Sequence, residues 1–192
     1  MATEEPQFEL LVKDGCFELR RYAPFITAET LVDGDMEAAS RTGFRLIADY
    51  IFGNNTNAGA TGRGDAASAS TRIAMTVPVT MAATATDLSA LSMTNQWRVH
   101  FVMPSQYSMA TLPRPNNAAV QLHQLPARTF AVATYTGFNT QASIGKHTDA
   151  LLAWLQSKAL HPAGAPELAR YNPPWTLPNR RRNEIHIEVK QR

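Results

Sequence analysis

Histidine and methionine side chains can coordinate a metal ion through a ring nitrogen or a thioether sulfur. No two histidines stand four residues apart, as they do in a helical metal site, and no carboxylate joins them in a recognisable cluster. We therefore predict no metal site and interpret the methionines as strand core. The possible metal ligands of these two types are His100, His123, His147, His161 and His186, and Met75, Met81, Met103 and Met109.

The most concentrated charge is a run of three arginines at residues 180–182. Guanidinium groups stay protonated and can hold a carboxylate through paired hydrogen bonds. The run could be a solvated turn before the last strand. It could also be a cationic rim that attracts an anionic ligand to a cleft. The sequence leaves both interpretations open.

The composition limits the classes of protein to consider. The chain has 192 residues, 44% of them apolar, so a substantial core is expected. Its 18 Lys and Arg residues nearly balance 16 Asp and Glu, which disfavours nucleic acid as a partner. The single cysteine, Cys16, excludes an internal disulfide, and we expect it to be half-buried in a strand. Without a leader-like N-terminus or a long apolar run, we expect a cytoplasmic protein with no membrane span; its oligomeric state stays open.

The hydrophobic pattern predicts two similar halves, each with the order strand, strand, helix, strand, strand. The first half has a hairpin-like pair at residues 17–22 and 25–32, a helix at 36–52 after an N-cap within 33–35, and strands at 75–81 and 97–103. The second half has strands at 120–125 and 129–135, a helix at 140–160, and strands at 168–171 and 183–189. We predict an α+β fold, a distorted eight-stranded β-barrel or curved sheet flanked by two α-helices.

Local features refine this architecture. Residues 54–71 are small and polar and predict a mobile loop. Pro78 stands inside a predicted strand, where the sheet should bend or lack a partner. His123 and His186 fall on the polar faces of their strands and are expected to be solvated. His147 lies near the apolar face of the second helix and is expected to be a hydrogen-bonded residue of the protein core. We predict one domain over 1–192, with halves of about 8–104 and 118–190 and a ligand cleft at their junction.

Four segments in the same order and spacing resemble the SOUL haem-binding protein family. They are FELRRY at 17–22, TGF at 42–44 with YIFG at 50–53, IAMTVPV at 73–79, and YNPPW at 171–175 leading to NRRRNEI at 179–185. The resemblance runs from about residue 8 to residue 189. It implies a distorted β-barrel made of two similar halves with two helices alongside.

For function, the resemblance implies non-covalent binding of haem or a related tetrapyrrole in a cleft beside the first helix, for buffering, transport or sensing. Such a ligand needs an apolar surface for its macrocycle and cations for its carboxylates. The first predicted helix offers both on the face opposite its core stripe, with Arg41, Phe44, Arg45 and Ala48. The resemblance aligns Arg41 with a basic residue that meets a propionate, and Phe44 with an apolar pocket position.

The chain departs from the family pattern at two positions. Relatives that ligate haem iron through histidine use the second residue of an Arg-His-Tyr triplet, which here is Arg20-Arg21-Tyr22. Arg21 cannot coordinate iron because its guanidinium stays protonated. A second basic position of the relatives is Asp49 here, which would repel a carboxylate. We therefore predict no axial ligand at the triplet.

An enzyme is the alternative. The two-half architecture resembles gyrase-inhibitor-like proteins, some of which are hydrolases that use a glutamate in the closing strand. Glu184 matches that position, and Tyr135 could supply a phenol opposite it. A carboxylate in an apolar cleft would have a raised pKa, which suits a general base. Glu184 could instead be a structural carboxylate that accepts hydrogen bonds. A third possibility, a cleft that holds a peptide, has no specific motif.

Overall fold

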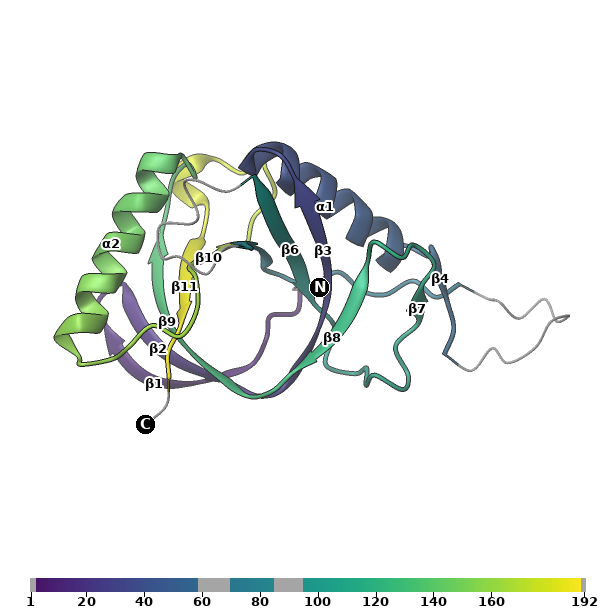
Figure 1. Ribbon diagram of the computed structural model, residues 1–192, viewed down its shortest axis with the longest axis horizontal. Helices are drawn as coiled ribbons and strands as arrows, with labels where there is room; N and C mark the ends of the chain where they lie inside the picture. The colour runs from purple at the N-terminus through teal and green to yellow at the C-terminus, as the bar shows by residue number, and fades with distance from the viewer. Residues whose placement is uncertain (1–2, 59–69, 85–94, 191–192) are drawn as a thin grey trace, which may run out of the picture.

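The computed structural model describes residues 3–58, 70–84 and 95–190 of the chain. Within these residues, nine strands form one strongly curled antiparallel sheet, and two long helices pack against its convex side (Figure 1). The strands of the sheet are β1 (Phe8–Asp14), β2 (Phe17–Tyr22), β3 (Phe25–Asp33), β5 (Val79–Ala83), β6 (Gln96–Val102), β8 (Gln121–Leu125), β9 (Arg128–Tyr135), β10 (Glu167–Arg170) and β11 (Asn183–Glu188). The helices are α1 (Met36–Ile51) and α2 (Gln141–Ser157); β4 (Asn55–Thr56) and β7 (Arg114–Pro115) form a separate short ladder.

The strand order, β1-β2-β9-β11-β10-β5-β6-β3-β8, shows how the two halves combine. Strands β5, β6 and β3 of the first half lie together, and so do β9, β11 and β10 of the second half. The two groups meet where β10 pairs with β5. The first strand of each half crosses over, so that β2 pairs with β9 and β8 pairs with β3. This exchange ties the halves into one continuous sheet.

The predicted pairing of residues 17–22 with 25–32 is wrong. These two strands exist as β2 and β3, but β2 pairs with β1 across a turn at Gly15, whose φ of 62° suits glycine. Pro24 has no backbone N–H to donate to a ladder, and it keeps the preceding residue extended. The chain therefore does not fold back at this point to pair β3 with β2. The edge strand β1 was missed, and Cys16 lies exposed in the β1–β2 turn instead of half-buried in a strand.

Helix α1 forms as its sequence predicts. The Asp35 side chain accepts hydrogen bonds from the backbone N–H groups of Glu37 and Ala38, at 3.0 and 2.8 Å, and caps the helix. The buried face includes Ala39, Gly43, Ile47 and Tyr50. Gly43 lies so close to β6 that a Cβ there would stand 2.6 Å from the Cβ of Val99. A glycine therefore sets the distance between helix and sheet.

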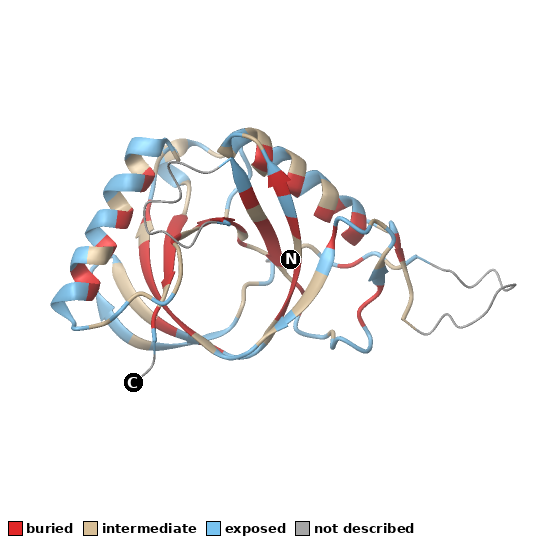
Figure 2. Ribbon diagram, in the orientation of Figure 1, coloured by how far each residue is buried: buried red, intermediate tan, exposed pale blue. Residues whose placement is uncertain are grey.

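Two apolar layers hold the helices on the sheet, and buried residues lie on the sheet-facing side of both (Figure 2). Under α1, the core includes Trp97, Val99 and Phe101 of β6. Under α2, Leu151 and Leu155 pack on the outward-facing residues of β9 and β11. Because side chains alternate along a strand, the other residues of β2, β9 and β11 point to the concave side. The polar phase of β11, with Glu184 and His186, thus faces inward, not into solvent.

Two further expectations concern the segments around β5. The strand begins at Val79, directly after Pro78, and the Val77–Pro78 peptide is cis. The expected loss of regular pairing at Pro78 is thereby confirmed, although the strand is shorter than predicted. Of the predicted loop 54–71, residues 55–56 form β4, and residues 59–69 lie outside the described residues. No described helix combines the length and the apolar character needed to cross a membrane.

Candidate functional site

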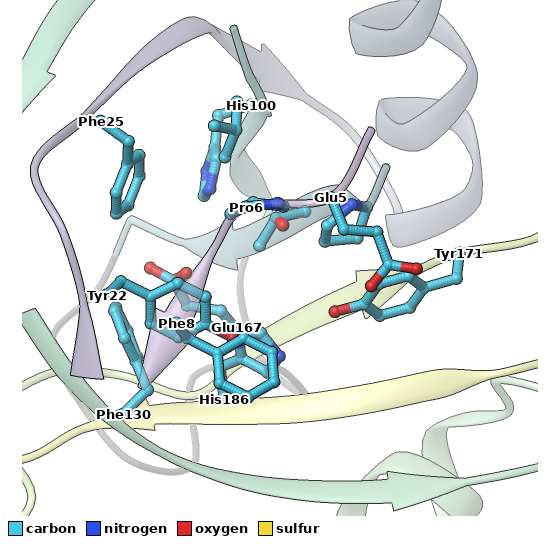
Figure 3. A pocket seen from close by; sticks show the side chains of 13 residues that line it. Glu5, Pro6, Phe8, Tyr22, Phe25, His100, Phe130, Glu167, Tyr171 and His186 are labelled. Carbon is cyan, nitrogen blue, oxygen red and sulfur yellow. The ribbon is translucent and has the colours of Figure 1, made fainter. Parts of the chain in front are cut away.

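A pocket lies on the concave side of the sheet, where strands of both halves meet (Figure 3). It contains about 460 Å³ of empty space, a volume that includes open solvent at its mouth. Its walls are mostly aromatic, with Phe8, Tyr22, Phe25, Phe130 and Tyr171. A cleft was predicted at the junction of the halves and beside the first helix; this pocket lies where the halves meet, but no residue of α1 lines it.

Glu184 of β11 lies next to this pocket and has no exposed surface. Its carboxylate accepts hydrogen bonds from Arg20 at 3.0 and 3.1 Å and from the Nε of Arg182 at 3.0 Å. The hydroxyl of Tyr171 donates to it at 2.7 Å, and the Nε2 of His186 lies 2.8 Å away. Such charge-assisted bonds are the strong ones in proteins, so Glu184 anchors β2, β11 and the end of β10 to one another.

The electrostatics of Glu184 differ from the expectation of a raised pKa. Burial alone would raise the pKa, but the hydrogen bonds and charges of His186 and Arg20 outweigh it and hold the pKa well below its usual range. The predicted raised pKa is therefore wrong. An ionised carboxylate with every oxygen engaged is a weak proton acceptor, which favours the structural interpretation of Glu184.

Tyr135 does not face Glu184. Residue 184 pairs with Thr134, and Tyr135, one position further along β9, points to the opposite side of the sheet. There its hydroxyl donates to the Oδ1 of Asn139 at 2.7 Å, and its ring stacks on His147 with centroids 4.0 Å apart. The phenol that meets Glu184 belongs to Tyr171, which sequence reasoning missed. No local pattern marks Tyr171, because the contact depends on the register of β10 on β11, in which Ala169, two residues before Tyr171, pairs with Glu184.

Two histidines line the pocket, two lie at the surface, and His147 of α2, expected in the core, is partly buried against Tyr135. His186 was expected to be solvated but is 7% exposed, because the polar phase of β11 faces the concave side. His100 of β6 is also buried and lines the pocket, and burial lowers its pKa to about 4. His123 is half-exposed beside Glu29 at 3.2 Å, and His161 is exposed. Within the described residues, no group of three or more His, Cys, Asp or Glu side chains could hold a metal ion.

The predicted binding face of α1 lies on the convex side of the molecule. Arg41 and Arg45 are exposed, and Phe44 is 39% exposed, with its ring centroid 5.6 Å from that of buried Phe101. Ala48 is almost fully buried. None of these four residues lines the concave pocket. The structure thus brings three of them together at the surface and keeps them separate from the aromatic cavity.

Arg21 and Asp49, the two residues at which the chain departs from the family pattern, both lie outside the pocket. Arg21 points away from the pocket and forms an exposed ion pair with Glu9 at 3.1 Å. Asp49 is exposed and accepts a hydrogen bond from the Nδ2 of Asn54 at 2.6 Å.

The arginine run 180–182 is neither a uniform rim nor a fully solvated turn. Arg180 is exposed in the 3₁₀ turn Pro178–Arg180. Arg181 donates to backbone carbonyls of Pro174 and Thr176 and lies over the ring of Phe138. Arg182 turns inward to Glu184. Only the last arginine therefore reaches the edge of the pocket.

Comparison with solved structures identifies proteins of the same fold. The C-terminal domain of EcmrR is 11% identical, with a TM-score of 0.65 over 92% of this chain and 98% of that one. An uncharacterized conserved protein from Listeria innocua is 12% identical, with a TM-score of 0.56 over 90% and 92%. A hydrolase encoded by lin2189 from Listeria innocua is 11% identical, with a TM-score of 0.56 over 91% of each chain. At these identities the likeness shows the fold alone.

Sequence comparison identifies the family. No curated protein sequence matches this chain. The description of the SOUL heme-binding protein family, however, matches residues 3–188, nearly the whole chain. The chain therefore belongs to the SOUL heme-binding protein family.

Proposed function

We propose that this protein binds haem or a related tetrapyrrole non-covalently at the exposed face of α1, for buffering, transport or sensing. Membership of a heme-binding family supports the ligand class. The observation that carries the site is the ring of Phe44, 39% exposed on the convex surface with exposed Arg41 and Arg45 beside it.

The α1 face suits a flat dianion. Residues three and four apart on a helix are neighbours, about 5–6 Å between Cβ atoms, so Arg41 lies one turn from both Phe44 and Arg45. The macrocycle would lie on Phe44, which Phe101 supports from below, while the guanidinium groups would hold the carboxylates. Asp49, one turn beyond Arg45, opposes a carboxylate on that side and directs the anionic edge toward Arg41.

The iron is not needed for this mode of binding. The residue at the family's histidine position is Arg21, which is engaged with Glu9 and cannot ligate iron. Haem and metal-free protoporphyrin should therefore bind with similar affinity.

The test is a visible-absorption titration of the protein with ferric haem and, separately, with protoporphyrin. Arg41→Ala should weaken the binding of both ligands about two- to five-fold, because that is what an exposed ion pair contributes to affinity. Lys146→Ala, which removes an exposed cation from α2, is the matched control and should change neither. Saturation by haem alone with a low-spin spectrum would instead show an axial ligand, and an unchanged affinity of Arg41→Ala would reject the α1 site.

A hydrolase with Glu184 as general base is the second candidate. The observation in its favour is the Glu184 carboxylate with the Tyr171 hydroxyl 2.7 Å away beside an aromatic pocket, in a fold shared with a protein described as a hydrolase. The lowered pKa of Glu184 weighs against it. Glu184→Gln should abolish turnover of p-nitrophenyl esters in a hydrolase, and it should leave haem affinity nearly intact in a binding protein.

A further inference from the structure

Residues 3–7, which we call the N-terminal strap, are tied to both halves of the sheet. The backbone N–H of Val77 donates to the carbonyl of Glu4 at 2.9 Å, and the N–H of Ser105 donates to the Glu4 carboxylate at 2.8 Å. Glu5 reaches the other half, where both its oxygens lie 2.9 and 3.0 Å from the NH1 of Arg182. Between these anchors, Glu5 and Pro6 form part of the pocket lining (Figure 3).

Arg182 stands between two carboxylates. Its Nε and NH2 bond Glu184, its NH1 bonds Glu5, and its guanidinium carbon lies 3.7 Å from the centroid of the Tyr171 ring. The Glu184 side is fully buried, whereas the Arg182 and Glu5 side chains are 36% and 39% exposed. The Glu5 contact is therefore the side of Arg182 that can open to solvent without disturbing Glu184.

The charges around Glu184 favour an anion at the position of Glu5. Arg20 and Arg182 both bond Glu184, which carries one negative charge. Glu18, the further partner of Arg20, is also paired with Lys13. When Glu5 leaves, one cationic charge at the pocket edge lacks a counterpart, and a carboxylate is the group that a guanidinium holds best.

The rest of the pocket points to an aromatic ligand with a polar substituent. Phe8, Tyr22, Phe25 and Phe130 surround the space, and Figure 3 shows His100 directed into it from the facing strand. His100 is 8% exposed and lines the pocket. A neutral imidazole has one donor and one acceptor, so its ring can hydrogen-bond a polar group of a ligand in the pocket.

We propose that the concave pocket is a second binding site, separate from the α1 face, that takes a small aromatic carboxylate. The ligand carboxylate replaces Glu5 on the NH1 of Arg182, and its ring lies among the aromatic side chains with a polar contact to His100. In the unliganded protein the strap occupies this site, so Glu5 acts as a tethered competitor. Each binding event then requires the strap carboxylate to leave.

Calorimetric titration with 2-naphthoate and with its neutral analogue 2-naphthamide tests the proposal. Glu5→Gln removes the competing charge and should tighten 2-naphthoate binding about two- to five-fold, because the apparent dissociation constant is inversely proportional to the fraction of open sites. Glu9→Gln is the matched control: it makes the same change nearby, at the exposed pair with Arg21 outside the pocket, and should have no effect. In the wild type, 2-naphthoate should also shift the NMR signals of the His100 ring and leave those of exposed His161 unchanged.

Three results would overturn the proposal: no binding of 2-naphthoate, equal affinities for the acid and the amide, or an equal gain in Glu5→Gln and Glu9→Gln. The NMR measurement needs no variant, so a poorly folded mutant does not remove the test. Arg41→Ala should leave 2-naphthoate binding intact while weakening haem binding. The α1 site and the concave site can therefore fail separately.

Discussion

Replacing Glu184 by glutamine removes a negative charge from a position that solvent does not reach. The variant leaves Arg20, whose side chain is 4% exposed, without its main counter-ion in the interior. Loss of one partner of a buried ion pair costs about 3–5 kcal/mol. Arg20 keeps a second contact with Glu18 at 2.6 Å, and Arg182 is partly exposed. We therefore expect the lower end, about 3 kcal/mol of unfolding free energy.

Urea unfolding at pH 7 measures this loss. The control is Glu188→Gln on the same strand, where Glu188 pairs with Arg128 at 3.3 Å and both side chains are about a third exposed or less. An ion pair of that exposure is worth at most about 1 kcal/mol. If the two variants were equally stable, the buried network would not hold the sheet together as we argue.

The same pair of proteins gives a pH dependence. The folded pKa of Glu184 is depressed below its ordinary value of 4.5, so the stabilisation is fully present above about pH 4.5 and is lost as the pH falls toward the folded pKa. The difference in unfolding free energy between wild type and Glu184→Gln should therefore be constant near neutral pH and shrink below about pH 4.5. A difference that stays the same down to pH 3 would contradict the depressed pKa.

Three further predictions concern single sites. Gly43→Ala should lower the unfolding free energy by about 1–3 kcal/mol, because the new Cβ would stand 2.6 Å from the Cβ of Val99. Gly145→Ala in α2 is the control: its Cβ would meet nothing within 4 Å, so the variant should be neutral or stabilising. The urea midpoints of the two variants test this difference. An NMR titration should place the pKa of the His100 ring at about 4. Because this lies below the ordinary 6.5, the unfolding free energy should fall as the pH drops from 6.5 toward 4. The fall should be smaller in His100→Gln. Asp35→Ala should cost about 1 kcal/mol in thermal or urea unfolding through loss of the α1 cap, and an unchanged stability would show that the cap is dispensable.

The sequence predicted well what local periodicity controls. The approximate bounds of α1 and α2, the cap at Asp35 and the strands β2, β3, β6, β8, β9, β10 and β11 follow from spacing along the chain. Strand β5 begins later than predicted, and the short strands β4 and β7 were not predicted. The edge strand β1 escaped because its apolar residues are largely exposed and its signal is weak. Within the candidate site, Glu184 was identified as a carboxylate of interest. Of the four α1 residues expected on an exposed face, Arg41, Phe44 and Arg45 are exposed, whereas Ala48 is buried.

Partners across the sheet could not be read from spacing. Strands β2 and β8 each pair with a strand of the other half. The partners of β2 in β9 lie more than a hundred residues away in the sequence, and no local pattern encodes such a pairing. The same holds for Tyr171, whose contact with Glu184 requires the register of β10 on β11.

The sequence alone determined which residues share a face of each strand, because alternation is a property of the extended backbone. It did not determine which face meets water. The sheet curls so that the polar face of β11 lines an enclosed concave side, and this turned His186 and Glu184 from expected surface or general-base groups into members of a buried network. Burial, and the pKa that depends on it, comes from the curvature of the whole sheet, and only the tertiary structure decides that.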